Sequence, residues 1–336
     1  MSPQSPACTS LIRGGWQLAG GHGAVDRAAA LADMRAFVDA GITTFDCADI
    51  YTGVESLIGD FRASVPAGTV RVHTKCVPDL NQLDTLRPEN LAETIERSRV
   101  RLRVDAIDLV QFHWWDYTRG DYLAAANALV ELRDRGLFTA LGLTNFGVHQ
   151  LRAMLEAGVP VATHQVQYSL LDRRPAAAMA PECAARGIGL LCYGALAGGF
   201  LHERWLGASE PTEPLENRSL VKYKLIIDEA GGWDRFQALL RALDAIARRH
   251  RVGIGTIAIR WVLDQPGVQS VIVGARHARH LAATVAAREI TLAARDHREI
   301  TDHLVDLTIP PGDVYELERD LTGRHGRIMR YDLTHA

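Results

Sequence analysis

The 336-residue sequence has few cysteines, no excess of charge of either sign and no long hydrophobic run. Its 5 cysteines form no CxxC pair and no Cys/His ligand spacing, which argues against a disulfide framework and a structural zinc site. The 37 Lys and Arg residues against 40 Asp and Glu residues give a formal charge of -3, without blocks of like charge. This balance argues against a polybasic nucleic-acid or membrane-surface binder.

The sequence shows no pattern typical of a membrane span or of a signal peptide. The longest uncharged stretch, residues 187–201, is broken by glycines and falls short of the ~20 residues that a membrane span needs. The N-terminal residues have neither the basic region nor the apolar region of a signal peptide. We therefore expect a globular, cytoplasmic protein that binds neither nucleic acid nor a membrane.

Short apolar runs of strand length recur along the chain, and each is followed by a longer segment with helical periodicity. The eight runs are residues 11–15, 43–46, 70–75, 107–113, 140–144, 163–168, 189–193 and 270–274. This alternation, with nearly continuous apolar strands, predicts an α/β fold in which helices cover a parallel sheet. The count of eight favours a closed (β/α)8 TIM barrel over an open doubly wound sheet.

The sequence shows no boundary that would split it into two domains. We expect a single domain over residues 1–336, with the barrel at about 11–290 and a C-terminal tail at about 291–336. One long interruption, residues 201–233, contains prolines and paired glycines and is interpreted as a loop between the seventh strand and its helix. Loops at that face of a barrel usually build sites.

Polar residues or glycines stand at the ends of seven of the eight predicted strands. All of them would lie at the C-terminal rim of a barrel, where barrel enzymes place their chemistry. A structural role, such as capping a helix or bonding a neighbouring loop, is the alternative for each one taken alone. The residues are Asp46, Lys75, His113, Asn145, Gln167 with Tyr168, Tyr193, and Gly274, Ala275 and Arg276.

Asp46, Tyr51, Lys75 and His113 together suit proton transfer to a carbonyl oxygen. A tyrosine of pKa ~10 is a poor acid–base catalyst at neutral pH until a nearby cation stabilises its phenolate. A lysine held by an aspartate provides that cation, and a histidine can orient or polarise the oxygen. The same four residues also fit a buried Asp46–Lys75 ion pair, a rim aromatic and a core histidine.

Familiar motifs give no support to other enzyme classes. Residues 253–258 formally match GxGxxG/A, but they follow a basic helical run instead of a strand, so we do not interpret them as a Rossmann fingerprint. The sequence has no GxxxxGK[ST], HExxH or GxSxG motif, which argues against a P-loop NTPase, a zinc protease and a serine hydrolase. We expect no metal site.

Several ordered motifs together resemble the aldo-keto reductase family. They are residues 41–51 (GITTFDCADIY), 55–59 (ESLIG), 74–75 (TK), 109–113 (LVQFH), 143–146 (LTNF), 167–169 (QYS), 193–199 (YGALAGG) and 273–276 (VGAR). The resemblance spans roughly residues 11–287 in the family's order, and a looser similarity points to a branch found in plants, fungi and bacteria. It implies an NADP(H)-dependent oxidoreductase that reduces the carbonyl of an aldehyde or ketone to an alcohol.

The resemblance implies that Asp46, Tyr51, Lys75 and His113 are the catalytic tetrad. Tyr51 would act as general acid in reduction and as base in oxidation, with its pKa lowered by Lys75. Asp46 would hold Lys75, and His113 would orient the carbonyl while the reduced nicotinamide supplies a hydride to its carbon. The substrate pocket would be bordered by Trp16, Tyr51, Trp114 and Trp115.

The cofactor site implied by the resemblance follows the same rim. Asn145 and Gln167 would hold the carboxamide, Tyr193 would stack on the nicotinamide, and Arg276 would favour NADP(H) over NAD(H) by binding the 2′-phosphate. His280 departs from the family, because many members have Gln or Arg there. The full set is Trp16, Asn145, Gln167, Tyr193, Gly194, Leu196, Gly198, Gly199, Gly274, Ala275, Arg276 and His280.

Two other functions are kept as alternatives. Some relatives of this family serve as nicotinamide-binding regulatory or redox-sensing subunits with little turnover, and an intact tetrad is compatible with that role. The third hypothesis is a barrel that uses Lys75 as a Schiff-base or acid–base residue without nicotinamide. A small-molecule carbonyl compound is the expected partner of a reductase, and no sequence feature indicates a particular oligomeric state.

Overall fold

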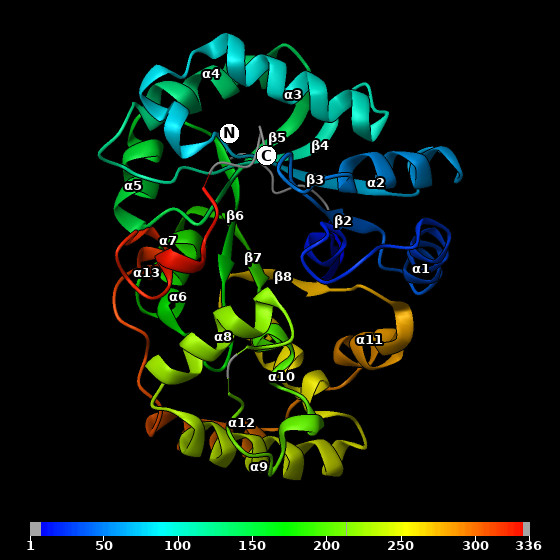
Figure 1. Ribbon diagram of the computed structural model, residues 1–336, viewed down its shortest axis with the longest axis vertical. Coiled ribbons are helices and arrows are strands. Elements are labelled where there is room, and N and C mark those ends of the chain that lie inside the picture. The colour runs from blue at the N-terminus through cyan, green and yellow to red at the C-terminus, as the bar shows by residue number, and fades with distance from the viewer. Residues whose placement is uncertain (1–7, 213, 332–336) are drawn as a thin grey trace.

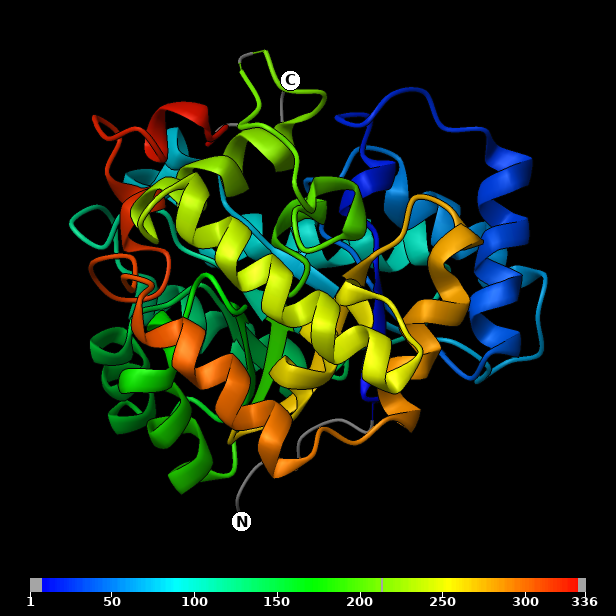
Figure 2. The same cartoon turned by 90° about the horizontal axis from the view of Figure 1, so that it is seen from below.

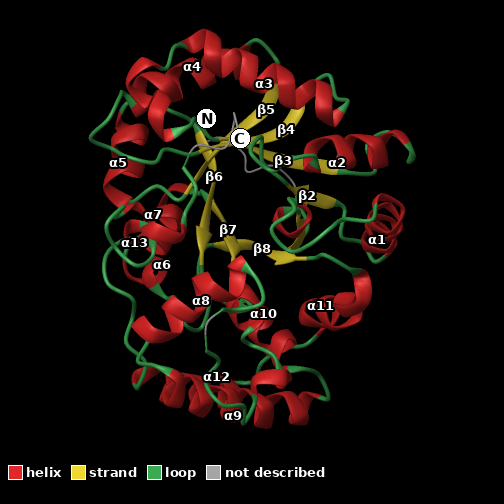
Figure 3. Cartoon of the chain, in the orientation of Figure 1, coloured by secondary structure: helices red, strands yellow, loops and turns green. Residues whose placement is uncertain are grey.

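Eight parallel strands close into a barrel in the computed structural model, which describes residues 8–212 and 214–331 (Figure 3). Each strand pairs with its neighbour in sequence, and the last pairs with the first. The predicted (β/α)8 barrel is confirmed, and no predicted strand end is more than two residues from the observed one. The strands are β1 (Leu11–Gly14), β2 (Thr44–Asp46), β3 (Arg71–Cys76), β4 (Ile107–Phe112), β5 (Phe138–Thr144), β6 (Val161–Gln167), β7 (Gly189–Tyr193) and β8 (Val268–Gly274).

Helices surround the barrel and link successive strands (Figure 1). Local signals explain several of their starts. The carboxylates of Asp26 and Asp121 accept backbone N–H groups in the first turns of α1 and α4, and Pro88 occupies the first position of α3. The helices are α1 (Arg27–Asp39), α2 (Val54–Ala63), α3 (Pro88–Leu102), α4 (Tyr122–Asp134), α5 (Val148–Glu156), α6 (Arg174–Ala177), α7 (Met179–Arg186), α8 (Arg218–Glu229), α9 (Trp233–His250), α10 (Ile254–Leu263), α11 (Leu281–Glu289), α12 (Ala294–Val305) and α13 (Glu316–Arg319).

The interior of the barrel changes from apolar to polar along its axis. Ile12, Leu109, Leu191 and Ile272 belong to a small inner cluster that is separate from the main core between strands and helices. Alternate residues of a strand face the same side, so the inward residue two positions after Leu109 is Gln111, which is buried and polar. The buried polar side chains of the barrel therefore gather at the carboxyl ends of the strands.

Residues 201–233 are not a plain loop, which corrects the interpretation from the sequence. They contain α8, which begins after Asn217, whose side chain accepts the Leu220 N–H at 3.1 Å. The helix buries Leu220, Tyr223, Ile226 and Ile227. The prolines of this segment come before Asn217, so they leave the hydrogen bonds of the helix intact.

Residues 253–258 open α10, and the element before them is α9 instead of a strand, so their GxGxxG pattern has no Rossmann context. The tail begins with α12, which packs against α9 outside the barrel (Figure 1). It then runs along one side of the molecule, orange to red in Figure 2, to α13. There Glu318 pairs with Lys222 of α8 at 3.2 Å, so tail and α8 meet over the strand ends.

Within residues 8–212 and 214–331, no helix combines the length and the apolar composition that crossing a bilayer requires. The same residues contain no group of three His, Cys, Asp or Glu side chains arranged to hold a metal ion.

Candidate active site

The ends of β2, β3 and the loop after β2 bring three predicted residues together. The Nζ atom of Lys75 lies 2.6 Å from Oδ2 of Asp46 and donates a second hydrogen bond, at 2.9 Å, to the carbonyl oxygen of Cys47. The same ammonium lies 5.1 Å from the centre of the Tyr51 ring. Lys75 and Asp46 are both buried, so water screens this pair little. The structure thus joins Asp46, Lys75 and Tyr51 into one cluster.

Burial and the charges of the cluster determine the pKa of Tyr51. Burial opposes the charge of Lys75, but Asp46 and the phenol of Tyr51 outweigh it and raise the pKa of the ammonium above its usual value. For Tyr51, burial raises the pKa of the phenol, and the nearby Lys75 only partly offsets this. The expected lowering by Lys75 is therefore present as one contribution, while the net pKa is raised. Tyr51 carries its proton at neutral pH.

The turn that leads to Tyr51 is fixed to the end of β3. Asp49 accepts the backbone N–H of Val77 at 3.2 Å and that of Ile50 at 2.9 Å. One turn later, buried Glu55 accepts the hydroxyl of Thr74 at 2.6 Å, next to Lys75 in sequence. Burial and the charge of Glu55 raise the pKa of Asp49 to about 8. These contacts hold the loop of Tyr51 against the strand of Lys75.

Two glutamines missed by sequence reasoning hold the second oxygen of Asp46. Oδ1 accepts the amide Nε2 of Gln111 at 2.9 Å and that of Gln165 at 2.7 Å, and Gln165 also donates to Oε1 of Gln111 at 2.8 Å. The signal was present in the sequence, because each glutamine stands two residues before a predicted site residue, His113 or Gln167, on the same face of its strand. The two amides are neutral, so they stabilise the Asp46 carboxylate by hydrogen bonds and leave its negative charge paired with Lys75.

His113 reaches the same rim, and one nitrogen of its ring is already engaged by the neighbouring strand β5. Its Nδ1 lies 3.1 Å from the carbonyl oxygen of Thr144. Burial and the charges of Arg319 and Lys75 lower the pKa of His113 to about 3. The neutral ring therefore has one proton, on Nδ1, and Nε2 presents a lone pair. The role of His113 in orienting a carbonyl group stays a prediction.

Aromatic side chains cover the cluster. The rings of Trp16 and Tyr51 have centroids 5.2 Å apart, and Trp115 meets His113 edge to face at 4.3 Å. The tail adds Tyr315, 5.6 Å from the ring of His113, and Tyr331, packed on Trp115. The tail tyrosines carry no local sequence signal for this role, because they lie some 200 residues after His113.

The position of Trp114 differs from the prediction that this side chain borders the substrate pocket. Its side chain is fully buried and packs on Phe112, with ring centroids 5.7 Å apart. Its indole N–H donates to the carbonyl oxygens of Asp116 and Arg119 in its own loop. Of the two tryptophans after His113, Trp115 is the one whose ring lies against the histidine.

The tail is tied down by buried charges. Glu318, 1% exposed, lies 3.2 Å from Nζ of Lys222 and 3.6 Å from the guanidinium of Arg174. Burial alone would raise the pKa of Glu318, but Lys222 and Arg174 lower it to about 2. Arg319 donates to the carbonyl oxygens of Trp114 and Asn145, at 2.9 and 2.8 Å. These bonds hold the tail across the loops that follow β4 and β5.

The residues predicted to hold the carboxamide and the nicotinamide ring lie at the ends of neighbouring strands. The Tyr193 hydroxyl donates to Oδ1 of Asn145 at 2.9 Å, and Asn145 adopts a positive φ of 63°. Nε2 of Gln167 donates to Asp172 at 2.6 Å, whereas its Oε1 is buried without a partner among residues 8–212 and 214–331. Gln167 thus has an acceptor to offer a ligand, and its donor is already used.

The glycine turn after Tyr193 is packed beneath α8. Gly194 and Gly198 have φ of 77° and 65°, and a Cβ atom at either position would collide with Tyr223. Gly199, at φ of 102°, has no atom within 4 Å of such a Cβ and is open. Leu196 packs against the N-terminal turn of α10 at Gly255. A glycine turn is therefore present after Tyr193, with one side covered by α8, and its binding of a pyrophosphate stays a prediction.

Basic side chains gather where the loops after β1 and β8 meet. Arg276 donates to the carbonyl oxygen of Ala24 at 3.0 Å, and burial together with Arg276 and Arg218 lowers the pKa of His22. The carbonyl oxygen of Ala275 accepts a hydrogen bond from Arg13 at 3.3 Å, and a Cβ atom at Gly274 would collide with the side chain of Gln17. His280 lies at the end of a short 3-10 turn and accepts Nε of Arg279 at 3.0 Å.

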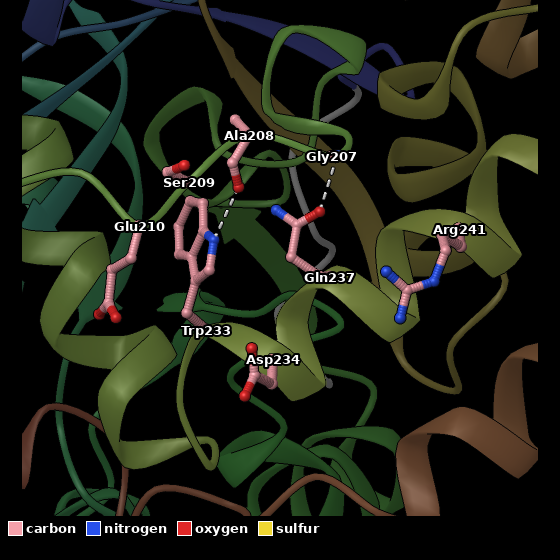
Figure 4. A pocket seen from close by; sticks show the side chains of 8 residues that line it. All are labelled: Gly207, Ala208, Ser209, Glu210, Trp233, Asp234, Gln237 and Arg241. Carbon is pink, nitrogen blue, oxygen red and sulfur yellow. Dashed lines mark hydrogen bonds between the residues drawn. The ribbon is translucent and has the colours of Figure 1, made fainter.

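A separate hollow lies outside this rim, between the start of α9 and the segment before α8 (Figure 4). Trp233 and Gln237 line it and hold its edge, because the Trp233 N–H donates to the carbonyl oxygen of Ala208 and Gln237 accepts the N–H of Gly207. It contains none of the predicted site residues.

A family model described as "Aldo/keto reductase family" matches residues 10–305. Aldo-keto reductase YhdN of Bacillus subtilis is 30% identical over 309 residues, which are 89% of this chain and 90% of that protein. Flagellar radial spoke protein 5 of Chlamydomonas reinhardtii is 32% identical over 179 residues, 48% of this chain but 34% of that longer protein. The structure of an aldo-keto reductase from Klebsiella pneumoniae in complex with NADPH has a TM-score of 0.69 at 22% identity, covering 93% of this chain and 97% of that one.

Proposed function

The chain belongs to the aldo/keto reductase family, and from this premise we propose that it reduces the carbonyl group of an aldehyde or ketone with NADPH. The observation that carries the proposal is the position of the Lys75 ammonium, 2.6 Å from Asp46 and 5.1 Å from the centre of the Tyr51 ring. Such a cation prepares a neighbouring phenol to give up its proton.

Tyr51 donates its phenolic proton to the carbonyl oxygen. A reduced nicotinamide, when bound, would supply the hydride for the carbonyl carbon. Lys75 stabilises the phenolate that remains, and Asp46, fixed by Gln111 and Gln165, keeps Lys75 in place. In alcohol oxidation the phenolate takes the proton back. The charged Lys75 is a poor nucleophile, which argues against the Schiff-base hypothesis.

The residues along the rim of the barrel fit NADP(H). The unpartnered Oε1 of Gln167 can accept an amide N–H of the carboxamide, and the ring of Tyr193 offers a stacking surface. The open backbone at Gly199 and the basic side chains of Arg276 and Arg218 suit the phosphates. The complex of the Klebsiella relative with NADPH supports the same choice of NADP(H) over NAD(H).

We also propose that residues 1–336 act as one domain, since the tail covers the site that the barrel builds. A cytoplasmic location stays a prediction. The regulatory alternative differs from the reductase in its turnover alone, so one experiment separates the two.

The test is a titration of the purified chain with NADPH and with NADH by quenching of tryptophan fluorescence, followed by a panel of aldehydes and ketones at 340 nm. Tighter binding of NADPH with oxidation by members of the panel supports the proposal. Tight binding without turnover supports the regulatory alternative. Absence of binding by either nucleotide would contradict both.

A further inference from the structure

The amide group of Gln167 is held in one orientation by a buried carboxylate. Nε2 of Gln167 donates to Oδ2 of Asp172 at 2.6 Å, and the two residues are 2% and 0% exposed. A carboxylate can only accept hydrogen bonds, so turning the amide over would place two acceptors against each other. The amide therefore keeps Oε1 for another partner, and within residues 8–212 and 214–331 this buried oxygen has none. A buried acceptor of this kind points to a ligand that supplies a donor.

Asp172 is itself fixed by a two-point contact with Arg174. Nε of Arg174 donates to Oδ1 of Asp172 at 2.9 Å, and Nη2 donates to Oδ2 at 2.7 Å. Both side chains are at most 1% exposed, so water screens this pair little. Two parallel bonds from a planar guanidinium fix the plane of the carboxylate as well as its position. The orientation of Gln167 thus depends on Arg174 as well as on Asp172.

Arg174 connects this pair to the tail. It begins α6, which lies beside α13 (Figure 1), and its Nη1 atom is 3.6 Å from Oε2 of Glu318. The same nitrogen donates to the carbonyl oxygen of Asp313 at 3.3 Å. Opening of the tail would remove both acceptors from Arg174 and so free its guanidinium to leave Asp172.

The tail also reaches the second residue that is expected to hold the carboxamide. Nη2 of Arg319 donates to the carbonyl oxygen of Asn145 at 2.8 Å. The side chain of Asn145 is held separately, because its Oδ1 accepts the Tyr193 hydroxyl at 2.9 Å. Two adjacent tail residues, Glu318 and Arg319, therefore contact the support of Gln167 and the backbone of Asn145 at the same time.

Resting on the proposed function, we propose that Asp172 and Arg174 are positioning residues for the cofactor. They keep Gln167 as an acceptor for an N–H of the nicotinamide carboxamide. Through Glu318 they couple this hydrogen bond to closure of the tail. Because such coupling is reciprocal, binding of the carboxamide stabilises the closed tail, and the closed tail strengthens the binding.

The first test compares NADP+ with its 3-acetylpyridine analogue, in which a methyl ketone replaces the carboxamide and no amide N–H remains. Dissociation constants are measured by quenching of tryptophan fluorescence and need no turnover. We expect the analogue to bind about tenfold more weakly to the wild type, because it leaves the buried Oε1 of Gln167 unpaired. In Asp172→Asn the replacing amide can donate to Gln167, which is then free to turn its own N–H groups to the ligand. The ratio of the two constants should therefore fall to about 1.

Asp296→Asn is the matched control, because Asp296 is also a buried aspartate paired with an arginine, Arg249 at 2.8 Å, but it lies on α12 outside the barrel. Its ratio should equal that of the wild type. Gln167→Met removes the acceptor itself and should give a ratio of about 1.

A ratio near 1 in the wild type would overturn the acceptor role of Gln167. The wild-type ratio in Asp172→Asn would overturn the positioning role of Asp172. Absence of NADP+ binding by the wild type would overturn the proposed function itself.

Hydrogen exchange of the tail tests the coupling without a change at Asp172, so it applies also if Asp172→Asn does not fold. With saturating nucleotide, exchange of residues 313–331 through opening of the tail should be slower with NADP+ than with the 3-acetylpyridine analogue, by about fivefold or more. Saturation by both nucleotides removes the difference in affinity from the comparison. The difference in exchange should vanish in Gln167→Met and persist in Asp296→Asn. Equal exchange with the two nucleotides in the wild type would overturn the coupling of the carboxamide to the tail.

Discussion

Replacement of Glu318 by glutamine removes the buried charge that ties the tail to the barrel. The pKa of Glu318 is lowered from its usual 4.5 to about 2 by Lys222 and Arg174. Each tenfold change in proton affinity corresponds to about 1.36 kcal/mol, so a pKa lowered from 4.5 to about 2 means that the ionised carboxylate stabilises the folded state by on the order of 3 kcal/mol at neutral pH. We expect Glu318→Gln to destabilise the closed tail by about that amount, because Lys222 and Arg174 lose their shared partner.

The pH dependence of this effect has a definite sign. The folded pKa lies below the unfolded one, so the stabilisation is complete above about pH 4.5 and is lost as the pH falls towards 2. The difference between wild type and Glu318→Gln should therefore be large at pH 7 and should shrink below pH 4.

Hydrogen exchange of residues 313–331 is the direct assay. A loss of about 3 kcal/mol predicts exchange from the opened tail that is roughly a hundredfold faster at pH 7. Glu316→Gln is the control on the same short helix, because Glu316 is exposed and its amide replacement can still accept the N–H of Asp313. Equal protection of the tail in Glu318→Gln and the wild type would refute the reasoning.

Three further changes test other parts of the site. Gln111→Met removes one donor to Asp46, so kcat should fall by roughly tenfold and its pH profile should shift, while the affinity for NADPH stays the same. The control is Gln237→Met, which changes a buried glutamine away from the tetrad and should leave the pH profile of kcat unchanged. Equal pH profiles for the two variants would contradict the positioning role of Gln111. Arg276→Ala should weaken NADPH by about tenfold more than NADH in fluorescence titrations, and equal losses would remove the argument for phosphate recognition. Gly194→Ala should lower the free energy of unfolding in urea by about 1–3 kcal/mol through its positive φ and the collision with Tyr223, and by more than Gly158→Ala, which shares the positive φ but meets no atom within 4 Å.

The strands could be predicted from the sequence because each buried strand is a short apolar run and each crossover helix has a clear period. The placement of Asp46, Lys75 and His113 followed from the same argument, since the carboxyl ends of parallel strands meet at one rim. α8 was missed because the prolines before Asn217 concealed a helix whose buried residues, such as Tyr223, recur at helical spacing.

Other features of the site depend on contacts between distant segments. Period and spacing could not tell Trp114 from Trp115, because the turn after β4 decides which one meets His113. The tautomer of His113 depends on the carbonyl of Thr144, which the pairing of β4 with β5 brings to it. Tyr315 and Tyr331 reach the site only through the fold of the tail.

The central claim is that Tyr51 supplies the proton for carbonyl reduction, and Tyr51→Phe tests it most directly. The variant keeps the ring against Trp16 and loses the hydroxyl. NADPH affinity, measured by fluorescence quenching, should match the wild type. NADPH oxidation at 340 nm with an aldehyde that the wild type reduces should fall by about 10²–10⁴-fold. Oxidation at the wild-type rate by Tyr51→Phe would contradict the account.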